Sequence, residues 1–262
     1  MKMKKNPWIK EAKRWKKNTQ EFILEKDSDA IEKFNNKFLD KKPEHKPYKI
    51  HEDLVPVPFL GNFKKAEVFF LQLNPGVEQP AGLKSTDLVA YKHFPGYKMD
   101  LLKNLRQEKM EYPFIDLNPK YILTGGSRYW RRVLSKVLSA LIKNKEDYKR
   151  ISKKICCLEY FPYHSEKFKK ISEYFGPKKY LDTQKFNFGI LKSVLGKKII
   201  IMRGKDHWSA ALREVGGDWN EEQIWELNSS QNVSITEKNL GKGQEGKDRF
   251  EAILKILRPT DE

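Results

Sequence analysis

Polar side chains stand at the ends of four short apolar runs of the sequence. They are Asn74 after residues 65–73, Glu159 near the end of residues 154–160, Arg203 after residues 198–202 and Asn228 after residues 223–227. An amide can orient a water molecule or donate to a leaving group, and a carboxyl can pair with a hydrogen-bonding ligand. If side chains of these types meet in one place, they can bind a polar ligand and help to break a bond within it.

The four apolar runs are expected to be buried strands, because each is short and ends in turn-forming residues. Helical segments are expected at residues 127–142, 186–194, 207–215 and 246–257. Short apolar strands that alternate with helices are typical of a parallel sheet covered on both faces. The sequence thus predicts an α/β fold, three-layer α/β/α, with a central, mainly parallel four-stranded sheet. Ligands bind such sheets beyond the carboxyl ends of the strands.

Residues 1–53 are predicted to form a basic helical N-terminal extension that packs on a domain of residues 54–262. The first 45 residues are polar and lysine-rich, and they carry a few large apolar anchors such as Trp8 and Phe22. Prolines between residues 43 and 58 indicate an irregular approach to the first strand. No low-complexity linker divides the chain after that point, so residues 54–262 are expected to be one α/β domain.

The charge of the chain is strongly positive. Its 52 Lys and Arg residues against 35 Asp and Glu residues give a formal net charge of +17. A basic surface attracts polyanions, and nucleic acid is the first candidate. An excess of lysine is also typical of proteins from AT-rich genomes, so the charge alone leaves both interpretations open.

Targeting and redox features are few. No apolar run reaches the roughly 20 residues of a membrane-spanning helix, and no apolar core follows the basic N-terminus. The two cysteines, Cys156 and Cys157, are adjacent, which predicts neither a disulfide framework nor a thiolate metal site. We therefore expect a cytoplasmic protein with no membrane contact, no metal and no cofactor.

The turn Leu73-Asn74-Pro75-Gly76 resembles the first catalytic motif of the uracil-DNA glycosylase superfamily. In the mismatch-specific and single-strand-selective branches that motif reads G-[IM]-N-P-G. Three later segments resemble, in the same order along the chain, the strand that reads the base, a strand that ends in Trp-Gly in many members, and the strand that leads into the second catalytic motif. They are residues 158–163, 199–204 and 224–230. The resemblance covers about residues 54–257 and implies a uracil-DNA glycosylase-like fold.

The chain departs from the superfamily pattern at four positions. Gln72 replaces a glycine of the first motif, Glu159 replaces an asparagine, Asn228 stands where many members have histidine, and Ser229 replaces a proline of the second motif. These departures concern the substrate and the catalytic efficiency more than the fold.

The resemblance also implies roles for individual residues. Asn74 and Asn228 are expected to be catalytic: the first holds the attacking water and the second donates to the leaving base. The base-binding residues are expected to be Glu159, Leu73, Gln72, Tyr163 and the stacking candidate Tyr91. The DNA-binding residues are expected to be Ser229, Ser230, Gln231, Asn232, Lys205 and His207.

Glu159 carries the hypothesis about which base is removed. An ionised carboxylate only accepts hydrogen bonds, so it favours the amino group of cytosine or adenine over the 4-oxygen of uracil. A protonated Glu159 can instead donate to a ring nitrogen, and burial favours that form. In the remaining interpretation Glu159 pairs with a nearby Lys or Arg and never meets a base.

Together these features predict a monofunctional DNA glycosylase that acts as a monomer on single- or double-stranded DNA. It would flip a base out of the stack and hydrolyse the bond between base and sugar, with an amino-bearing or modified cytosine preferred to plain uracil. Two alternatives stay open. One is a catalytically inactive glycosylase-like module that binds nucleic acid, and the other is an unrelated α/β enzyme that acts on small nucleotides.

Overall fold

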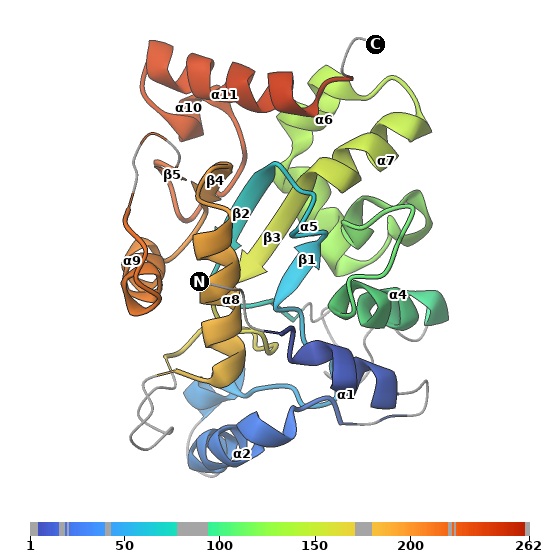
Figure 1. Cartoon of the computed structure of the whole chain (residues 1–262), viewed down its shortest axis with the longest axis vertical. Coiled ribbons are helices and arrows are strands. Elements are labelled where there is room, and N and C mark those ends of the chain that lie inside the picture. Colours follow the sequence, from blue (N-terminus) through green and yellow to red (C-terminus); the bar gives the residue numbers. More distant parts are fainter. Residues whose placement is uncertain are drawn as a thin grey trace.

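The fold is built around a five-stranded mixed sheet with the strand order β1-β3-β2-β4-β5 (Figure 1). The computed structural model describes residues 5–15, 19, 21–39, 43–77, 94–170, 180–219, 222 and 224–259. The strands are β1 Phe59–Gly61, β2 Val68–Gln72, β3 Ile155–Glu159, β4 Lys198–Ile201 and β5 Ile224–Glu226. β2 runs parallel to β3 and β4, β4 runs parallel to β5, and β1 is antiparallel to β3 at the edge.

The predicted α/β class is confirmed, whereas the predicted number of four strands is wrong. The four predicted strands are present, and β1 adds a fifth that the sequence did not reveal. β1 is only three residues long and follows Pro56 and Pro58, so its sequence is typical of an irregular segment. It ends at Gly61, whose φ of +113° and close approach to the backbone of Ile155 exclude a side chain.

Most of the predicted helices are present with shifted ends. They are α8 Asp182–Ser193, α9 Lys205–Glu214 and α11 Gln244–Leu257. The predicted helix 127–142 is divided into α5 Gly125–Val133 and α6 Ser135–Leu141. The division occurs where the Val133 carbonyl accepts a hydrogen bond of 2.8 Å from the amide of Ile235, a long-range contact that no local pattern predicts. The helix α7 Lys145–Lys154, which precedes β3, was not predicted.

Helices cover both faces of the sheet. On one face Phe70 of β2 packs against Trp130 of α5, with ring centroids 5.5 Å apart. On the other face Phe59 of β1 packs against Phe186 of α8 at 6.5 Å. Phe70 pairs with Cys157 and Phe59 pairs with the next residue, Leu158, so the two contacts lie on opposite faces. In Figure 1, α8 lies in front of the sheet and α5 behind it.

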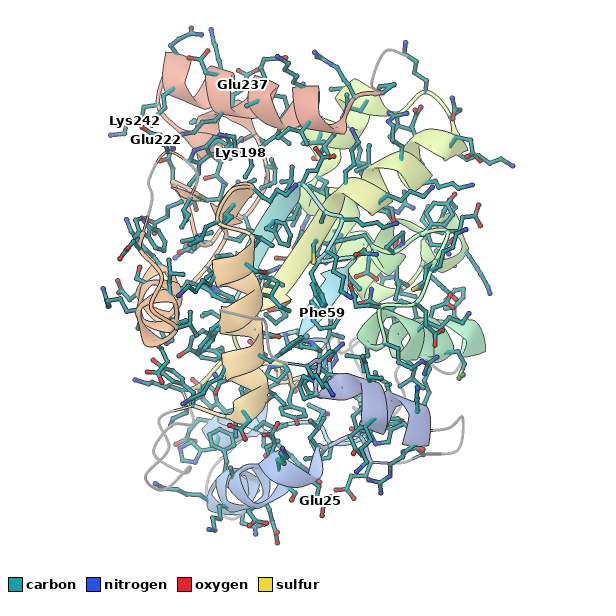
Figure 2. The ribbon with its side chains drawn as sticks, in the orientation of Figure 1. Glu25, Phe59, Lys198, Glu222, Glu237 and Lys242 are labelled. Carbon is teal, nitrogen blue, oxygen red and sulfur yellow. The ribbon has the colours of Figure 1, made fainter. Side chains whose placement is uncertain are left out.

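The remaining helices surround this core. They are α4 Pro95–Leu105, α10 Glu237–Leu240 and the short 3-10 helices η1 Pro43–Tyr48, η2 Ile115–Leu117 and η3 Pro119–Tyr121. Figure 2 shows the buried side chain of Phe59 near the middle of the molecule, while the charged residues Glu25, Glu237 and Lys242 lie toward its periphery. No helix among the described residues has the length and apolar character needed to cross a membrane.

The N-terminal segment shares the hydrophobic core of the sheet domain. It contains α1 Trp8–Arg14 and α2 Glu25–Leu39, and Trp8 is completely buried. Asp27 of α2 is also completely buried; its Oδ2 atom accepts hydrogen bonds from the Tyr163 hydroxyl at 2.7 Å and the Thr183 hydroxyl at 2.8 Å. These bonds join α2 to the loop after β3 and to α8.

We expect Tyr163→Phe to lower the free energy of unfolding by about 1–3 kcal/mol, because a buried carboxyl loses one of its hydrogen-bond donors. Denaturant titration of the wild-type and variant proteins measures the difference. Ring packing is retained in phenylalanine, so a change of this size reports on the hydroxyl. An unchanged free energy of unfolding would show that the bond to Asp27 contributes nothing to the attachment of α2.

Candidate active site

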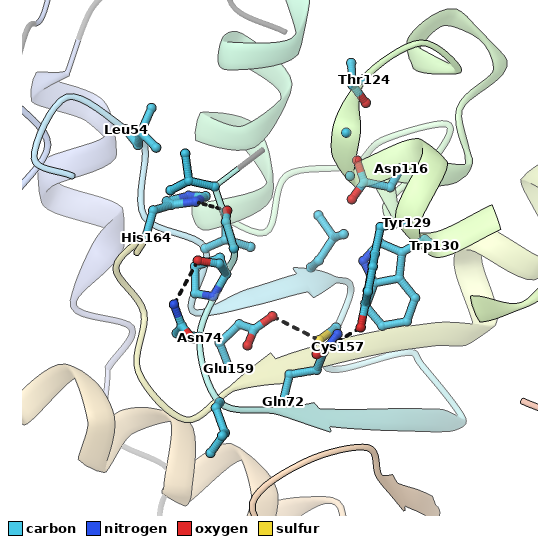
Figure 3. Close-up of a pocket in the computed structure, with 18 of the residues that line it drawn as sticks. Leu54, Gln72, Asn74, Asp116, Thr124, Tyr129, Trp130, Cys157, Glu159 and His164 are labelled. Atoms are coloured by element: carbon cyan, nitrogen blue, oxygen red, sulfur yellow. Dashed lines mark hydrogen bonds between the residues drawn. The ribbon is translucent and has the colours of Figure 1, made fainter. Parts of the chain in front are cut away.

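A cavity of about 850 Å³ opens at the carboxyl ends of the parallel strands (Figure 3). The ends of β2, β3 and β4 contribute Gln72, Asn74, Glu159 and Arg203 to its wall. In the register of the sheet Gln72 of β2 lies beside Glu159 of β3. Because the strands are parallel, residues that are far apart in the sequence meet at this one edge. This is the arrangement that the sequence predicted for Asn74 and Glu159.

Asn74 is held in a fixed orientation by its own side-chain amide. Its Nδ2 atom donates to the carbonyl oxygens of Pro75 at 3.1 Å and Ser165 at 3.0 Å, and to the Ser165 hydroxyl at 2.9 Å. Its Oδ1 atom has no hydrogen bond within the described part of the chain. Asn74 therefore presents an acceptor oxygen, which can hold a water molecule but is a poor base.

His164 fastens the Asn74-Pro75-Gly76 turn from the side. Its Nδ1 atom lies 3.0 Å from the carbonyl oxygen of Gly76, and its Nε2 atom lies 3.0 Å from that of Val55. Burial lowers the pKa of His164. A neutral ring has one N–H group and can donate to only one of these carbonyls at a time, but its position between them places it in contact with both loops at the cavity wall.

The two residues before Asn74, Gln72 and Leu73, each have a contact of their own. The Tyr129 hydroxyl of α5 donates to Oε1 of Gln72 at 3.1 Å, and burial raises the pKa of Tyr129 to about 12. Leu73 packs on Gly204, which has a φ of +78°. A Cβ atom at Gly204 would lie 2.3 Å from Cδ2 of Leu73, so only glycine fits after Arg203.

Glu159 is the buried acid of the site. Its side chain is 6% exposed, Oε1 accepts from the Cys157 thiol at 3.5 Å, and Oε2 has no hydrogen-bond partner among the described residues. Burial raises the pKa of Glu159 to about 8, although the Cys157 thiol and the charge of Arg203 oppose the shift. At neutral pH the carboxyl is therefore mostly protonated, and it can both donate and accept.

The second predicted catalytic residue, Asn228, is not among the residues that line the cavity. It is exposed after β5, its Nδ2 atom donates to the carbonyl of Lys238 at 2.9 Å, and its backbone amide donates to that of Asn239 at 2.8 Å. Both bonds turn Asn228 toward α10. The turn that follows is joined to the site by Arg203, whose Nε atom donates to the Ser230 carbonyl at 3.3 Å.

The predicted DNA-binding residues differ in exposure and in their contacts. In the turn after β5, Ser230, Gln231 and Asn232 are exposed and Ser229 is half-buried. Lys205 is paired with Glu226 at 2.9 Å. His207 packs on Tyr160 and Phe168, and burial lowers its pKa.

One predicted base-binding residue lies away from the cavity wall, and a second belongs to a part of the chain that the structure does not describe. Tyr163 is fully buried, is not among the cavity-lining residues and contacts Asp27 instead. Tyr91 lies outside the described residues.

The far wall of the cavity was not predicted. It is formed by residues of α4, η2 and the start of α5, namely Tyr97, Leu101, Asp116, Thr124–Gly126, Arg128–Trp130 and Arg132. The helical pattern at 127–142 was visible in the sequence, but no signal showed that its beginning faces Glu159. Just before this helix, Ile122 and Leu123 are 48% and 61% exposed.

The fold and the site together define an α/β protein with a cavity at the carboxyl edge of its sheet, in which apolar walls surround a few polar side chains. Comparisons with protein-family models, with curated proteins and with solved structures found no match. Among the described residues, no group of three or more His, Cys, Asp or Glu side chains is placed to hold a metal ion.

Proposed function

We propose that this chain is a DNA glycosylase with a uracil-DNA glycosylase-like fold, which flips a base from DNA and hydrolyses its N-glycosidic bond. The observation that carries the proposal is the meeting of Asn74 and Glu159 in one cavity at the ends of adjacent parallel strands. Asn74 offers an oriented acceptor for water, and Glu159 offers a buried acid for the base. Breaking an N-glycosidic bond requires a positioned water and stabilisation of the departing base.

The proposed reaction uses Glu159 as a general acid. The bond between C1′ of the sugar and the base breaks while the carboxyl proton moves to the base ring nitrogen, so the base leaves neutral. A water held by Oδ1 of Asn74 adds to C1′ and gives up a proton to solvent. Solvent then reprotonates Glu159. The products are the free base and an abasic site.

The protonation of Glu159 changes the expectation about the base. A neutral carboxyl can pair with cytosine by donating to the ring nitrogen and accepting from the amino group, but it can pair with uracil by the reverse arrangement. Pairing therefore does not exclude uracil. Acid catalysis favours the amino-bearing base, because cytosine leaves poorly as an anion whereas uracil does not need the proton. We therefore retain an amino-bearing or modified cytosine as the proposed substrate.

The charge around the cavity supports DNA as the partner. Arg128 and Arg132 of α5 line it together with Lys167 and Arg203. With a formal net charge of +17, the chain is expected to attract the phosphate backbone, and its affinity should fall steeply with salt. Phosphates can bind at this rim while the flipped base enters the cavity. One protein molecule has all the groups that this reaction uses, which is consistent with action as a monomer.

The direct test is base release from single- and double-stranded oligonucleotides that carry uracil, mismatched thymine, hypoxanthine, cytosine or modified cytosines. Abasic sites are detected by alkaline cleavage. Release of one base, lost in Asn74→Ala, would support the glycosylase. Tight, salt-sensitive binding without release from any oligonucleotide would favour an inactive DNA-binding module, and absence of both would favour an enzyme of small nucleotides.

Ile122 and Leu123 offer an apolar wedge for a duplex, since an extruded base leaves a gap that such side chains can fill. We expect Leu123→Ser to lower kcat/KM on duplex DNA by roughly tenfold, because base flipping there costs a few kcal/mol, and to leave activity on single strands almost unchanged. The matched control is Ile9→Ser, since Ile9 is also exposed, at 37%, but belongs to α1. Equal losses on duplex and single-stranded DNA would exclude a wedge.

A further inference from the structure

A second buried acid lies across the cavity from Asn74 (Figure 3). Asp116 of η2 is 4% exposed and lines the cavity with Tyr97 of α4 and Thr124–Gly126 at the beginning of α5. Its Oδ1 atom accepts from the Tyr97 hydroxyl at 2.8 Å. Its Oδ2 atom accepts no hydrogen bond from any described residue. We name the group formed by Tyr97, Asp116 and Thr124–Gly126 the Asp116 subsite.

Among the residues that the structure describes, no cation forms an ion pair with Asp116. Arg131 is the cation that acts on it, but the Arg131 guanidinium donates to the Leu117 carbonyl and the Ser127 hydroxyl instead. Burial raises the pKa of Asp116 to about 6, so the group is mostly ionised at neutral pH. Because Asp116 lines the cavity and no described residue donates to its Oδ2 atom, this atom is available to a ligand that supplies a donor.

The fold keeps this subsite open by means of a glycine. A Cβ atom at Gly126 would lie 2.5 Å from Oδ2 of Asp116, so any side chain there would collide with the carboxylate. The first turn of α5 can therefore approach Asp116 closely, and the positive end of the helix dipole helps to stabilise the charge. The acid is held at the cavity wall and is not displaced toward solvent.

The size of the cavity and the sign of this charge restrict the ligand. About 850 Å³ lies in the upper part of the roughly 300–1,000 Å³ typical of pockets for drug-sized ligands, and a single pyrimidine is much smaller. The extra space beside Asp116 does not suit a DNA phosphate, because two anions repel each other there. It suits a group that has hydrogen-bond donors and no negative charge.

We propose that the Asp116 subsite binds a hydroxyl- or amino-bearing substituent on the target base, so that the substrate is a nucleobase enlarged by a polar group such as a hydroxymethyl or a sugar. This inference rests on the proposed glycosylase function. Glu159 holds the edge of the base, and Asp116 accepts hydrogen bonds from the substituent. A base without such a substituent leaves the carboxylate unsatisfied, and it is therefore disfavoured.

The test compares duplexes that carry cytosine, 5-methylcytosine, 5-hydroxymethylcytosine, glucosylated 5-hydroxymethylcytosine or an N4-hydroxyalkyl cytosine. We expect the wild-type protein to prefer a hydroxylated substituent to the methyl group. Asp116→Ala should lower kcat/KM for the preferred base by roughly 10- to 100-fold, the value of a hydrogen bond to a charged group. Release of unsubstituted cytosine should not fall, because the variant lacks the carboxylate that such a base leaves unsatisfied.

A matched control is available within the same region. Asp100 of α4 accepts from the Tyr121 hydroxyl at 2.7 Å, much as Asp116 does from Tyr97, but it does not line the cavity. Asp100→Ala should leave the preference among bases unchanged. Thermal melting of both variants shows whether they fold. Tyr97→Phe is a milder second test: it keeps the Asp116 carboxylate and removes the hydroxyl that donates to it, so the same preference among bases should be reduced by less.

The outcomes separate this inference from the function on which it rests. Best release of an unsubstituted base, or an equal loss on all bases in Asp116→Ala, would overturn the subsite while the glycosylase stands. If no base is released, binding to the same duplexes is measured by fluorescence anisotropy. A preference for hydroxylated bases that disappears in Asp116→Ala would then support the subsite without catalysis, and equal binding of all duplexes would overturn it.

Discussion

Replacement of Asn74 by alanine is expected to lower kcat for base release by roughly 100-fold, with little change in DNA affinity. In the proposed mechanism Oδ1 of Asn74 holds the attacking water, and misplacement of a reactant by about 1 Å already costs a factor of this order. Three hydrogen bonds to Pro75 and Ser165 fix the amide in its orientation. Single-turnover rates with saturating protein separate this chemical step from binding.

The orientation of Asn74 allows two further variants. Asn74→Asp offers a stronger base, but it places a carboxylate oxygen against the carbonyls of Pro75 and Ser165, so we expect it to be impaired as well. Ser165→Ala removes only the bond from the hydroxyl, and we expect a smaller loss, below about tenfold. Full activity in Asn74→Ala would show that the water is held elsewhere and would remove Asn74 from the mechanism.

Glu159→Gln is expected to lower the rate of release of an amino-bearing base strongly, because glutamine has no proton to transfer. The wild-type rate should be level below pH 8 and fall about tenfold per pH unit above it, as the acid with a pKa of about 8 ionises. The variant should have a low rate that does not change across this range. Rates measured from pH 6 to pH 10 on one substrate test both expectations.

Arg203 provides an independent control for the alkaline limb of this profile. Its positive charge lowers the pKa of Glu159, so Arg203→Gln should move the limb to higher pH while leaving the acid in place. A limb that stays in place in Arg203→Gln and persists in Glu159→Gln would assign the titration to another group.

The substitution Glu159→Gln, which is expected to lower activity, is expected to raise the stability of the protein. The pKa of Glu159 is raised from its ordinary value of 4.5 to about 8 in the folded protein, so the cost of burying the acid is absent below pH 4.5 and grows as the pH rises toward 8. At pH 7 the cost is about 3 kcal/mol. We therefore expect Glu159→Gln to be more stable than the wild-type protein at pH 7 by a value of this order, and nearly equal to it at pH 4. Denaturant titration at the two pH values measures the difference, and equal stabilities at pH 7 would show that the acid is already ionised there.

The sequence by itself determined where the main strands end and which polar groups follow them. An apolar run stopped by Asn74-Pro75-Gly76 can hardly continue as a strand, because proline cannot donate to the sheet and glycine favours a turn. Runs of the same kind ended near Glu159 and at Arg203. Since parallel strands present their carboxyl ends at one edge, the meeting of Asn74 and Glu159 followed from local patterns alone.

Only the tertiary structure decided what surrounds these residues. Asp116 and Tyr129 reach the cavity because η2 and α5 pack over the sheet, and such contacts between distant segments have no local signature. The same is true of Asn228, which follows a correctly predicted strand but is turned away by its bonds to α10. Local sequence sets the backbone geometry, whereas burial and long-range packing set the direction in which a side chain points and its protonation state. The protonation of Glu159 is therefore a property of the folded chain, because it arises from burial in the assembled cavity.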